Sequence, residues 1–242
     1  MSIWVVGTDT SVGKTVVSAL ILSRYMDCGS IAYWKPVSTG GEDDRDFSTM
    51  EVLLVGKLQK ATGKGGIQIL EETYHFDEPV SPHLAARLAG ETIDPEKVLE
   101  DLVTHGLEDQ QRNLLIEGAG GLLVPLNEDG YLLLDLIVAT ALPVVLVARS
   151  TLGTINHTLL SLEALRARHV EIAGVVLNGP YNRENALAIE RLGRVQIIGE
   201  VPLLLEDGTV SSREINQASP TFDTQGILEK YFSIPEDSEN YS

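Results

Sequence analysis

The chain has 242 residues, of which 43% are hydrophobic and 22% are charged. This composition is ordinary for a globular protein with a sizeable core, and it excludes a disordered, collagen-like or disulfide-stapled chain. Thirty-five acidic residues against 18 Lys and Arg give a formal net charge of -17. Such a surface repels phosphates, so we expect neither nucleic acid nor a membrane as a partner.

Neither metal-ligand spacing nor a targeting signal is visible. Cys28 is the only cysteine, and the five histidines are scattered along the chain, so no zinc site is expected. The first residues lack a basic region and a cleavage signal, which predicts the cytoplasm. The longest apolar stretch, 132–148, contains Asp135 and Pro143, so we predict a helix, a break at the proline and a buried strand rather than a membrane span.

Short apolar runs recur along the chain and do not alternate with polar residues. Such runs indicate strands buried on both faces, as in a parallel sheet covered by helices. They are residues 3–6, 31–34, 114–116, 144–147, 174–177 and 196–201. Segments with helical periodicity lie between them, at 15–26, 81–88, 95–107, 156–168 and 182–192.

This alternation predicts an α/β fold with a doubly wound, mostly parallel sheet and helices on both faces. We expect a single domain over residues 1–232, followed by a frayed acidic tail at 233–242. Parallel α/β sheets bind ligands at the carboxyl ends of their strands. Polar and glycine-rich residues follow almost every predicted strand, so that edge of the sheet is the predicted site.

The segment after the first strand reads Gly-Thr-Asp-Thr-Ser-Val-Gly-Lys-Thr over residues 7–15. It resembles the phosphate-binding loop Gly-x4-Gly-Lys-Ser/Thr, although Thr8 stands in the first glycine position. In such a loop Lys14 pairs with phosphate oxygens and the Thr15 hydroxyl ligates Mg²⁺. A strand before the loop and a helix after it favour this interpretation over a plain glycine turn, and they predict a P-loop NTPase-like fold.

Two further ionisable groups stand at strand ends. Glu117 follows three apolar residues and precedes Gly-Ala-Gly-Gly, which suits a second metal ligand better than a packing role. Lys35 ends a buried strand and can neutralise a transferring phosphoryl group. The alternatives are a satisfied acid and a surface lysine. One acid of the run 42–46 can complete the metal site, although such runs are usually solvated loops.

Thr154 and Asn156 can cap a helix that starts near Asn156, and a helix end of this kind binds carboxylates. An ordinary N-cap is an equally good interpretation. From the residues alone, the chain is an Mg²⁺-dependent ATPase or ATP-dependent transferase with a second anion site, and the acceptor is not readable.

Seven motifs together resemble the dethiobiotin synthetase family, stand in its order and cover nearly the whole chain as far as Pro202. They are residues 7–15, Lys-Pro-Val-Ser-Thr-Gly at 35–40, Ser-Pro-His at 81–83, Glu-Gly-Ala-Gly-Gly at 117–121, Leu-Gly-Thr-Ile-Asn-His at 152–157, Val-Leu-Asn at 176–178 and Gly-Glu-Val-Pro at 199–202.

The resemblance implies an enzyme of biotin biosynthesis that uses ATP and Mg²⁺. Its substrate is 7,8-diaminononanoate, which is carboxylated by CO₂ and closed to dethiobiotin, with release of ADP and phosphate. One amine becomes a carbamate, the carbamate takes the γ-phosphoryl group, and the other amine attacks the mixed anhydride. The family is a homodimer whose substrate site lies at the subunit interface.

The resemblance also implies roles for single residues. Lys35, Lys14 and Thr10 act on the reacting groups, and Thr39 contacts the substrate. The segment Gly153, Thr154, Ile155 and Asn156 of one subunit holds the substrate carboxylate across the interface. The nucleotide contacts are Ser11, Val12, Gly13, Lys14, Thr15, Val16, Glu117, Gly118, Ala119, Gly120, Asn178, Gly179, Pro202, Leu203 and Leu204, of which Asn178 and the backbone at 202–204 face the adenine.

The implied metal ligands are Thr15, Glu117 and an acid of the 44–46 cluster, where Asp44 is favoured over Asp46. Two positions depart from the family pattern. Ser11 stands where many members have Glu, so the role of that acid is unfilled. Leu203 replaces a frequent aromatic residue beside the base.

Three alternatives compete with this interpretation. A partitioning or positioning ATPase of the same superfamily usually carries a second lysine early in the phosphate loop, which this loop lacks before Gly13. An amidating synthetase needs a glutaminase domain with a nucleophilic cysteine, and Cys28 alone leaves no room for one. The third is a nucleotide-binding protein without turnover, which Lys35 and Thr39 disfavour.

Overall fold

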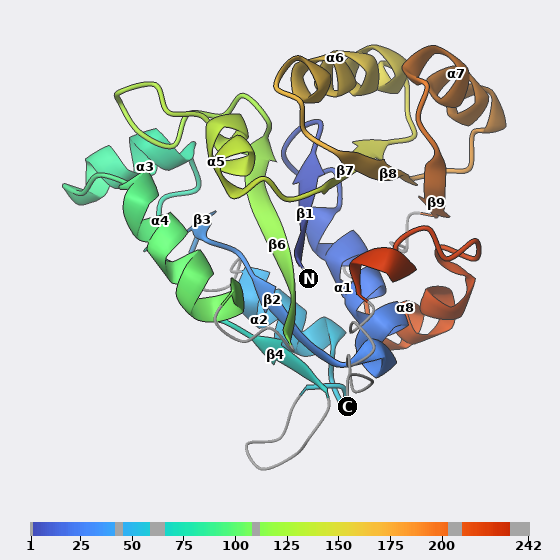
Figure 1. The fold of residues 1–242 in the computed structure, drawn as a ribbon, viewed down its shortest axis with the longest axis horizontal. Helices are drawn as coiled ribbons and strands as arrows, with labels where there is room; N and C mark the ends of the chain where they lie inside the picture. Colours follow the sequence, from blue (N-terminus) through green and yellow to red (C-terminus); the bar gives the residue numbers. More distant parts are fainter. Residues whose placement is uncertain (1, 42–45, 59–65, 108–111, 203–209, 233–242) are drawn as a thin grey trace, which may run out of the picture.

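The computed structural model describes residues 2–41, 46–58, 66–107, 112–202 and 210–232. Within them, seven parallel strands form one sheet in the order β4-β2-β6-β1-β7-β8-β9 (Figure 1). The strands are β1 Ser2–Gly7, β2 Ser30–Trp34, β4 Ile67–Ile69, β6 Arg112–Gly121, β7 Val144–Arg149, β8 Ile172–Asn178 and β9 Ile197–Val201. A second, two-stranded parallel sheet pairs β3, Val37–Thr39, with β5, Tyr74–Phe76.

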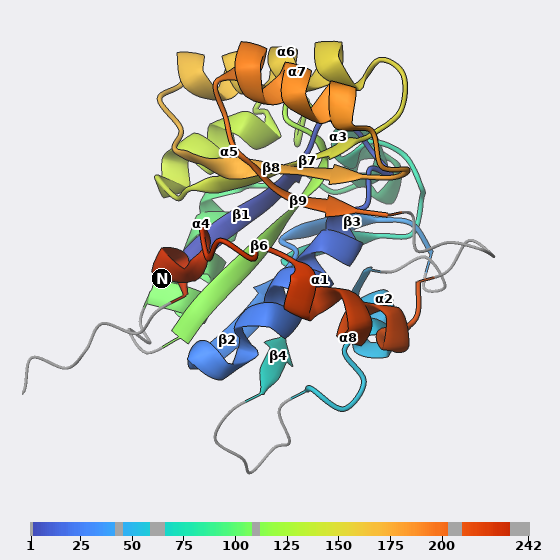
Figure 2. The ribbon, with the colours of Figure 1, turned by 90° about the vertical axis from the view of Figure 1, so that its right-hand side faces the viewer.

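Helices cover both faces of the large sheet, as Figure 2 shows. One face carries α1 Lys14–Tyr25, α2 Asp46–Leu53, α8 Ser212–Ala218 and the chain as far as Phe232. The other carries α3 Pro82–Ala89, α4 Pro95–Leu102, α5 Leu133–Thr140, α6 Thr154–Ala167 and α7 Arg183–Gly193. The remaining turns are 3-10 helices at Met26–Cys28, Ser219–Thr221 and Glu229–Tyr231 and a π-helical turn at Val103–Leu107.

The central strand β1 shows why its sequence is apolar throughout. Ile3 and Val5 pack with the side chains of α1, whereas Trp4 and Val6 belong to the core on the opposite face. All four side chains are fully buried, and each such burial contributes about 1.5–3 kcal/mol. Because β1 lies between β6 and β7, the chain leaves it at the point where the strand order changes direction, which is where such sheets bind ligands.

The last described segment is fastened to the far end of α1. The Tyr25 hydroxyl donates to Asp223 Oδ2 at 2.5 Å, and the backbone N–H groups of Ile227 and Leu228 donate to the same buried carboxylate. Burial and the hydrogen bond to Asp223 raise the pKa of Tyr25 well above its ordinary value. The Tyr25 ring also stacks on Phe232, with 4.9 Å between the ring centroids.

The predicted fold class is confirmed, and so is the break at Pro143 between a helix and a buried strand. Several boundaries differ from the prediction, two of them by five residues. The strand predicted at 114–116 runs from Arg112 to Gly121, and glycine is needed in its second half, because a Cβ on Gly118 would lie 2.9 Å from Leu133 and one on Gly120, at φ +65°, would lie 2.9 Å from Val124. The α-helix predicted at 95–107 stops at Leu102 and widens into the π-helical turn.

The predicted tail at 233–242 lies outside the described residues. Of the helices that the structure describes, none combines the length and apolar character needed to span a bilayer.

Candidate active site

The phosphate loop lies between the end of β1 and the start of α1. Its turn into the helix uses Gly13 in a left-handed conformation, φ +93°. A Cβ there would lie 2.0 Å from Asn178 Nδ2, which instead donates to Val12 O at 2.9 Å. Only glycine fits this position, and the amino end of α1 behind it attracts anions through its N–H groups and dipole.

Lys14 and Val16 follow in the first turn of α1. Lys14 is 6% exposed, and its ammonium reaches back across the loop to donate to Asp9 O at 3.2 Å. The ammonium therefore lies against the backbone of the loop, and in a phosphate loop the lysine of this position pairs with phosphate oxygens. Val16 is partly buried and packs toward the core on the α1 face.

Glu117 is fully buried within β6 and gathers donors from several elements. Thr15 Oγ1 donates to its Oε1 at 3.0 Å, and Ser18 and Tyr33 donate to its Oε2 at 2.8 and 3.1 Å. Lys35 Nζ lies 3.5 Å from Oε1. A buried carboxylate is costly unless its charge is paired and its oxygens are hydrogen-bonded, and here both conditions are met.

The Thr15 and Glu117 oxygens fit a small hard cation. Mg²⁺ prefers oxygen ligands, keeps several waters and takes the rest from phosphates, so two protein oxygens side by side suffice. Within the described ranges no group of three or more His, Cys, Asp or Glu side chains is arranged for a metal. Asp46 begins α2, but Asp44 and the rest of the acidic run before it lie outside those ranges.

The first half of the loop is held by an arginine that sequence reasoning missed. Arg149 is the last residue of β7, and its Nη2 donates to Thr10 O at 2.8 Å and lies 3.7 Å from Asp9 Oδ2. Ser11 adopts a left-handed conformation, φ +55°. Arg149 shares with Lys35 the position of a cation at the end of a buried strand, and this signal could have found it from the sequence.

The predicted substrate residues occupy two places. Thr39 ends β3, next to Ser38, whose hydroxyl lies 2.8 Å from His75 Nδ1 and 3.3 Å from Glu72 Oε1. The helix predicted to start near Asn156 starts at Thr154, and its N-cap is Gly153, φ +92°. The predicted capping roles of Thr154 and Asn156 were therefore wrong, because both residues lie inside the first turn and no side chain caps it. The buried Thr154 hydroxyl lies 3.4 Å from Thr158 Oγ1 instead.

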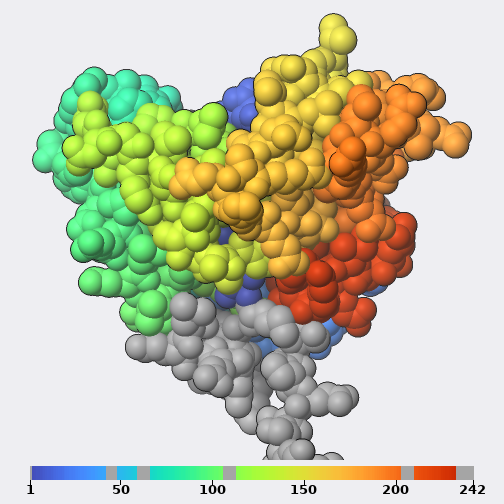
Figure 3. All heavy atoms as spheres, turned by 45° about the horizontal axis from the view of Figure 1, so that its top comes forward, coloured from blue at the N-terminus to red at the C-terminus, as the bar shows by residue number. Residues whose placement is uncertain are grey.

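Asn156 is exposed and Ile155 is partly buried, so this segment has both a polar and an apolar side chain at the surface. The next residue, His157, lines a hollow of about 470 Å³ beside the phosphate loop. Leucine, valine and proline side chains supply most of its wall, and Thr8, Asp9 and Thr10 supply the polar side. Figure 3 shows the blue amino-terminal part of the chain emerging between the green segment after β6 and the yellow α6.

The predicted nucleotide contacts of the glycine-rich segment lie along the end of β6. Gly118 has no room for a side chain, since a Cβ would lie 2.9 Å from Leu133. Gly120 has φ +65°, and its Cβ position lies 3.6 Å from Thr10 Oγ1. Ala119, between them, is 9% exposed. Of the three, Gly120 is thus the residue that lies next to the phosphate loop.

On the other side of the loop, Asn178 ends β8 and Gly179 follows with φ +133°. Pro202 is exposed just after β9. Leu203 and Leu204 lie outside the described residues, so the predicted contacts of this segment with the adenine stay predictions.

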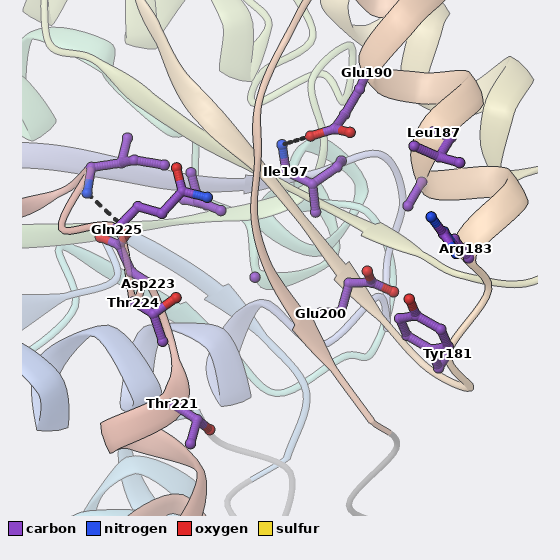
Figure 4. A pocket seen from close by; sticks show the side chains of 14 residues that line it. Tyr181, Arg183, Leu187, Glu190, Ile197, Glu200, Thr221, Asp223, Thr224 and Gln225 are labelled. Atoms are coloured by element: carbon purple, nitrogen blue, oxygen red, sulfur yellow. Dashed lines mark hydrogen bonds between the residues drawn. The ribbon is translucent and has the colours of Figure 1, made fainter.

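A second hollow, of about 360 Å³, contains none of the predicted site residues. It lies between α7, β9 and the segment 221–227 (Figure 4). Glu190 Oε1 accepts from Ile197 N at 3.2 Å on one side of it. Burial, and the nearby charge of Glu190, raise the pKa of Glu200 on β9. The hollow is built on the edge of the sheet and does not include the phosphate loop.

Comparison with known proteins agrees with this geometry. The AAA domain family model matches residues 1–207. Among solved structures, a ParA family ATPase of Chlorobium tepidum is similar with a TM-score of 0.57 at 12% identity, covering 95% of this chain and 96% of that one. The septum site-determining protein MinD of Pyrococcus horikoshii gives 0.59 at 15%, covering 95% and 93%. These two similarities describe the fold alone.

Curated relatives are much more similar in sequence. ATP-dependent dethiobiotin synthetase BioD of Brucella ovis is 44% identical over 200 residues, which are 83% of this chain and 85% of that protein. The protein of the same name from Lawsonia intracellularis is 41% identical over 205 residues, 84% and 89% of the two chains. With its phosphate loop, buried Glu117 and Lys35 in place, the chain belongs to the family of ATP-dependent dethiobiotin synthetases.

Proposed function

We propose that the protein catalyses ATP- and Mg²⁺-dependent closure of 7,8-diaminononanoate and CO₂ to dethiobiotin. The observation that carries the proposal is the cluster of Thr15, Glu117 and Lys35 beside the phosphate loop, with Glu117 fully buried. A switch ATPase needs the loop and the metal ligands, whereas a second buried cation beside them suits the transfer of a phosphoryl group to an anionic acceptor.

The reaction runs in three steps whose charges explain the two lysines. One neutral amine adds to CO₂ and loses a proton, giving a carbamate anion. A carbamate oxygen attacks the γ-phosphorus, and the bond to the β–γ bridging oxygen breaks to release ADP. The second amine then attacks the carbamoyl carbon, phosphate leaves, and a proton is lost as the cyclic urea closes. In the second step an anion approaches a polyanion, so cations must screen both partners.

Lys14, whose ammonium lies against the backbone of the phosphate loop at Asp9, supplies one of those charges. Lys35, 9% exposed and held directly after the last residue of β2, supplies another from the acceptor side. Thr15 and Glu117, with Asp44 or Asp46, would hold Mg²⁺, which supplies charge neutralisation on the β- and γ-phosphate oxygens. Thr10, whose hydroxyl oxygen lies near Gly120, would flank the point where the carbamate meets the γ-phosphate.

The hollow beside the loop supports an acceptor with a methylene chain. Its Thr8–Thr10 side can face the amines, and its leucine-rich wall suits the carbons that lead to the carboxylate. Thr39 would contact the substrate from the β3 side. Leu123 and Leu160, which line this hollow, are 61% and 62% exposed, and Leu152, two residues before α6, is 103% exposed. Large exposed apolar side chains favour contact with a partner. This supports a homodimer in which residues 153–156 of one subunit hold the substrate carboxylate of the other.

The test measures phosphate release from purified protein with MgATP and bicarbonate, with and without 7,8-diaminononanoate, followed by mass spectrometry. We expect release that depends on the diamine and a product heavier than the diamine by CO minus two hydrogens. ATP hydrolysis that does not depend on the diamine would reject this function in favour of a partitioning or positioning type of switch ATPase.

Sedimentation of wild type and Leu152→Asp tests the homodimer, since a charged side chain at position 152 should shift the population to monomer.

A further inference from the structure

Arg149 contacts the phosphate loop from a strand that the loop does not belong to. Its guanidinium is about half exposed, and it donates to Thr10 O at 2.8 Å. We propose that Arg149 is a positioning residue for phosphoryl transfer, one that holds the first half of the phosphate loop in its reactive conformation. The proposal rests on the proposed function for its choice of reaction.

The hydrogen bonds explain why this part of the loop needs support. Thr10 N donates to Asp9 Oδ1 at 2.7 Å, so the peptide plane before Thr10 is held locally. The plane after Thr10 carries the carbonyl that Arg149 binds. Rotation of that plane changes ψ of Thr10 and φ of Ser11, and Ser11 has φ +55°, where residues other than glycine are strained. By binding this carbonyl, Arg149 therefore opposes a change of the loop that would relieve the strained backbone of Ser11.

The charges around Arg149 connect it to Lys14. Asp9 Oδ2 lies 3.7 Å from the guanidinium, and Asp9 O accepts from Lys14 Nζ at 3.2 Å. Asp9 thus lies between the two cations, and a loop that shifts at residues 9–11 also withdraws one anchor of Lys14. Because the lysine of a phosphate loop pairs with the β- and γ-phosphates, we expect such a shift to act on the transferred group.

The second half of the loop has a separate support. Ser150 N donates to Asn178 O, and Asn178 Nδ2 donates to Val12 O, each at 2.9 Å. These bonds hold residues 12 and 13 without the Arg149 side chain. Loss of that side chain should therefore damage the step at the γ-phosphate while leaving the binding of a nucleoside diphosphate nearly intact.

The experiment compares wild type, Arg149→Ala, Arg149→Lys and the control Arg87→Ala. Arg87 is a similarly exposed arginine whose partner, Glu128, is remote from the loop. We expect Arg149→Ala to lower kcat for diamine-dependent phosphate release at least about 10-fold, since small misplacements of reacting groups have effects of this size. The Kd for MgADP, measured by calorimetry, should change less than about 3-fold. Methylguanidinium should restore part of the activity to Arg149→Ala, because the site is open to solvent.

An unchanged kcat in Arg149→Ala would overturn the proposal, and so would a loss of MgADP affinity equal to the loss of kcat. If Arg149→Ala does not fold, Arg149→Lys keeps the aliphatic stem and the charge, and full activity in that variant would show that the guanidinium geometry is not needed. If wild type shows no dependence on the diamine, the proposed function fails instead. The basal ATP hydrolysis of the same variants then replaces kcat, and no difference between them would overturn the role of Arg149.

Discussion

Lys35 Nζ lies 3.5 Å from Glu117 Oε1, the same oxygen that accepts the Thr15 hydroxyl at 3.0 Å. The same carboxylate oxygen therefore contacts both Lys35, which follows β2, and Thr15, which lies on α1. A divalent ion bound at this oxygen would weaken the pull of Glu117 on Lys35, and the ammonium could then face an incoming anion. On the proposed function, metal binding and the availability of the Lys35 ammonium would therefore be linked through Glu117.

This relationship predicts the behaviour of Lys35→Gln. The variant loses the charge on the acceptor side, so kcat should fall about 100-fold or more, while the affinity for MgATP changes much less. Steady-state kinetics and nucleotide titration measure the two effects. Lys97→Gln serves as the control, since Lys97 lies on α4 with its ammonium over the Tyr74 ring. An equal loss of nucleotide affinity would make Lys35 an ATP contact only.

Glu117→Gln should raise the Mg²⁺ concentration needed for half-maximal activity about 10-fold or more, because a neutral amide is a weaker ligand than a carboxylate. The amide keeps the size of the side chain and can still accept from Ser18 or Thr15. Activity against Mg²⁺ concentration checks this. Glu163→Gln, on the exposed surface of α6, should leave the curve unchanged, and an unchanged curve for Glu117→Gln would remove Glu117 from the metal site.

Gly13→Ala should abolish measurable ATP binding. The new Cβ would meet Asn178 Nδ2 at 2.0 Å in a backbone with φ +93°, so the turn and the bond to Val12 O cannot both persist. Gly90→Ala is the matched control, because Gly90 also has a positive φ, +74°, but no atom lies within 4 Å of its Cβ position. That variant should lose about 1 kcal/mol of stability and keep its affinity for ATP. Normal binding by Gly13→Ala would contradict the close approach of the loop to Asn178 on β8.

Asn156→Ala should raise the KM for 7,8-diaminononanoate about 10-fold, the usual effect of losing a hydrogen bond to a charged group, with the KM for ATP unchanged. Thr151→Ala, at an exposed position outside the helix, is the control. Thr154→Ala should act mainly on stability, because that side chain is buried against Thr158. No change in the KM of Asn156→Ala would place the substrate carboxylate elsewhere.

The acid limb of the stability curve should depend on Asp135. The N–H of Leu132 and the Arg168 guanidinium donate to this carboxylate at 2.9 and 2.6 Å and hold its pKa below the usual range. Its contribution is complete above the unfolded pKa and disappears as pH falls through the lower folded pKa. Asp135→Asn should therefore melt at a lower temperature than wild type at pH 7, and the gap should close as the pH falls below the ordinary pKa of an aspartate. A gap that stays constant with pH would contradict this assignment.

The sequence was sufficient for the framework of the molecule. Unbroken apolar runs such as 144–147 predict buried parallel strands, and the loop before Lys14 has a spacing that few other structures share. β3 and β5 escaped prediction because three-residue strands with Ser38 and His75 have no apolar pattern. The helix cap at Gly153 also escaped, since glycine at that position depends on a backbone conformation that local polarity does not reveal.

The contacts that the site residues make could not be predicted from the sequence. Glu117 is stabilised by Ser18 and Tyr33, and Arg149 reaches Thr10 across 139 positions of sequence. Such contacts arise when the strand order brings β2, β6, β1 and β7 together, and strand order is decided by packing of the whole chain.

The hydrogen bond from Tyr25 to Asp223 has a consequence for folding during translation. α1 carries Lys14 and Thr15 at one end and is fastened at the other by residues near the end of the described chain. A nascent polypeptide still attached to its ribosome holds the phosphate loop sequence early but lacks the segment that secures the helix behind it. We therefore expect the ability to bind nucleotide to be acquired late in translation, when Asp223 and Phe232 have left the exit tunnel.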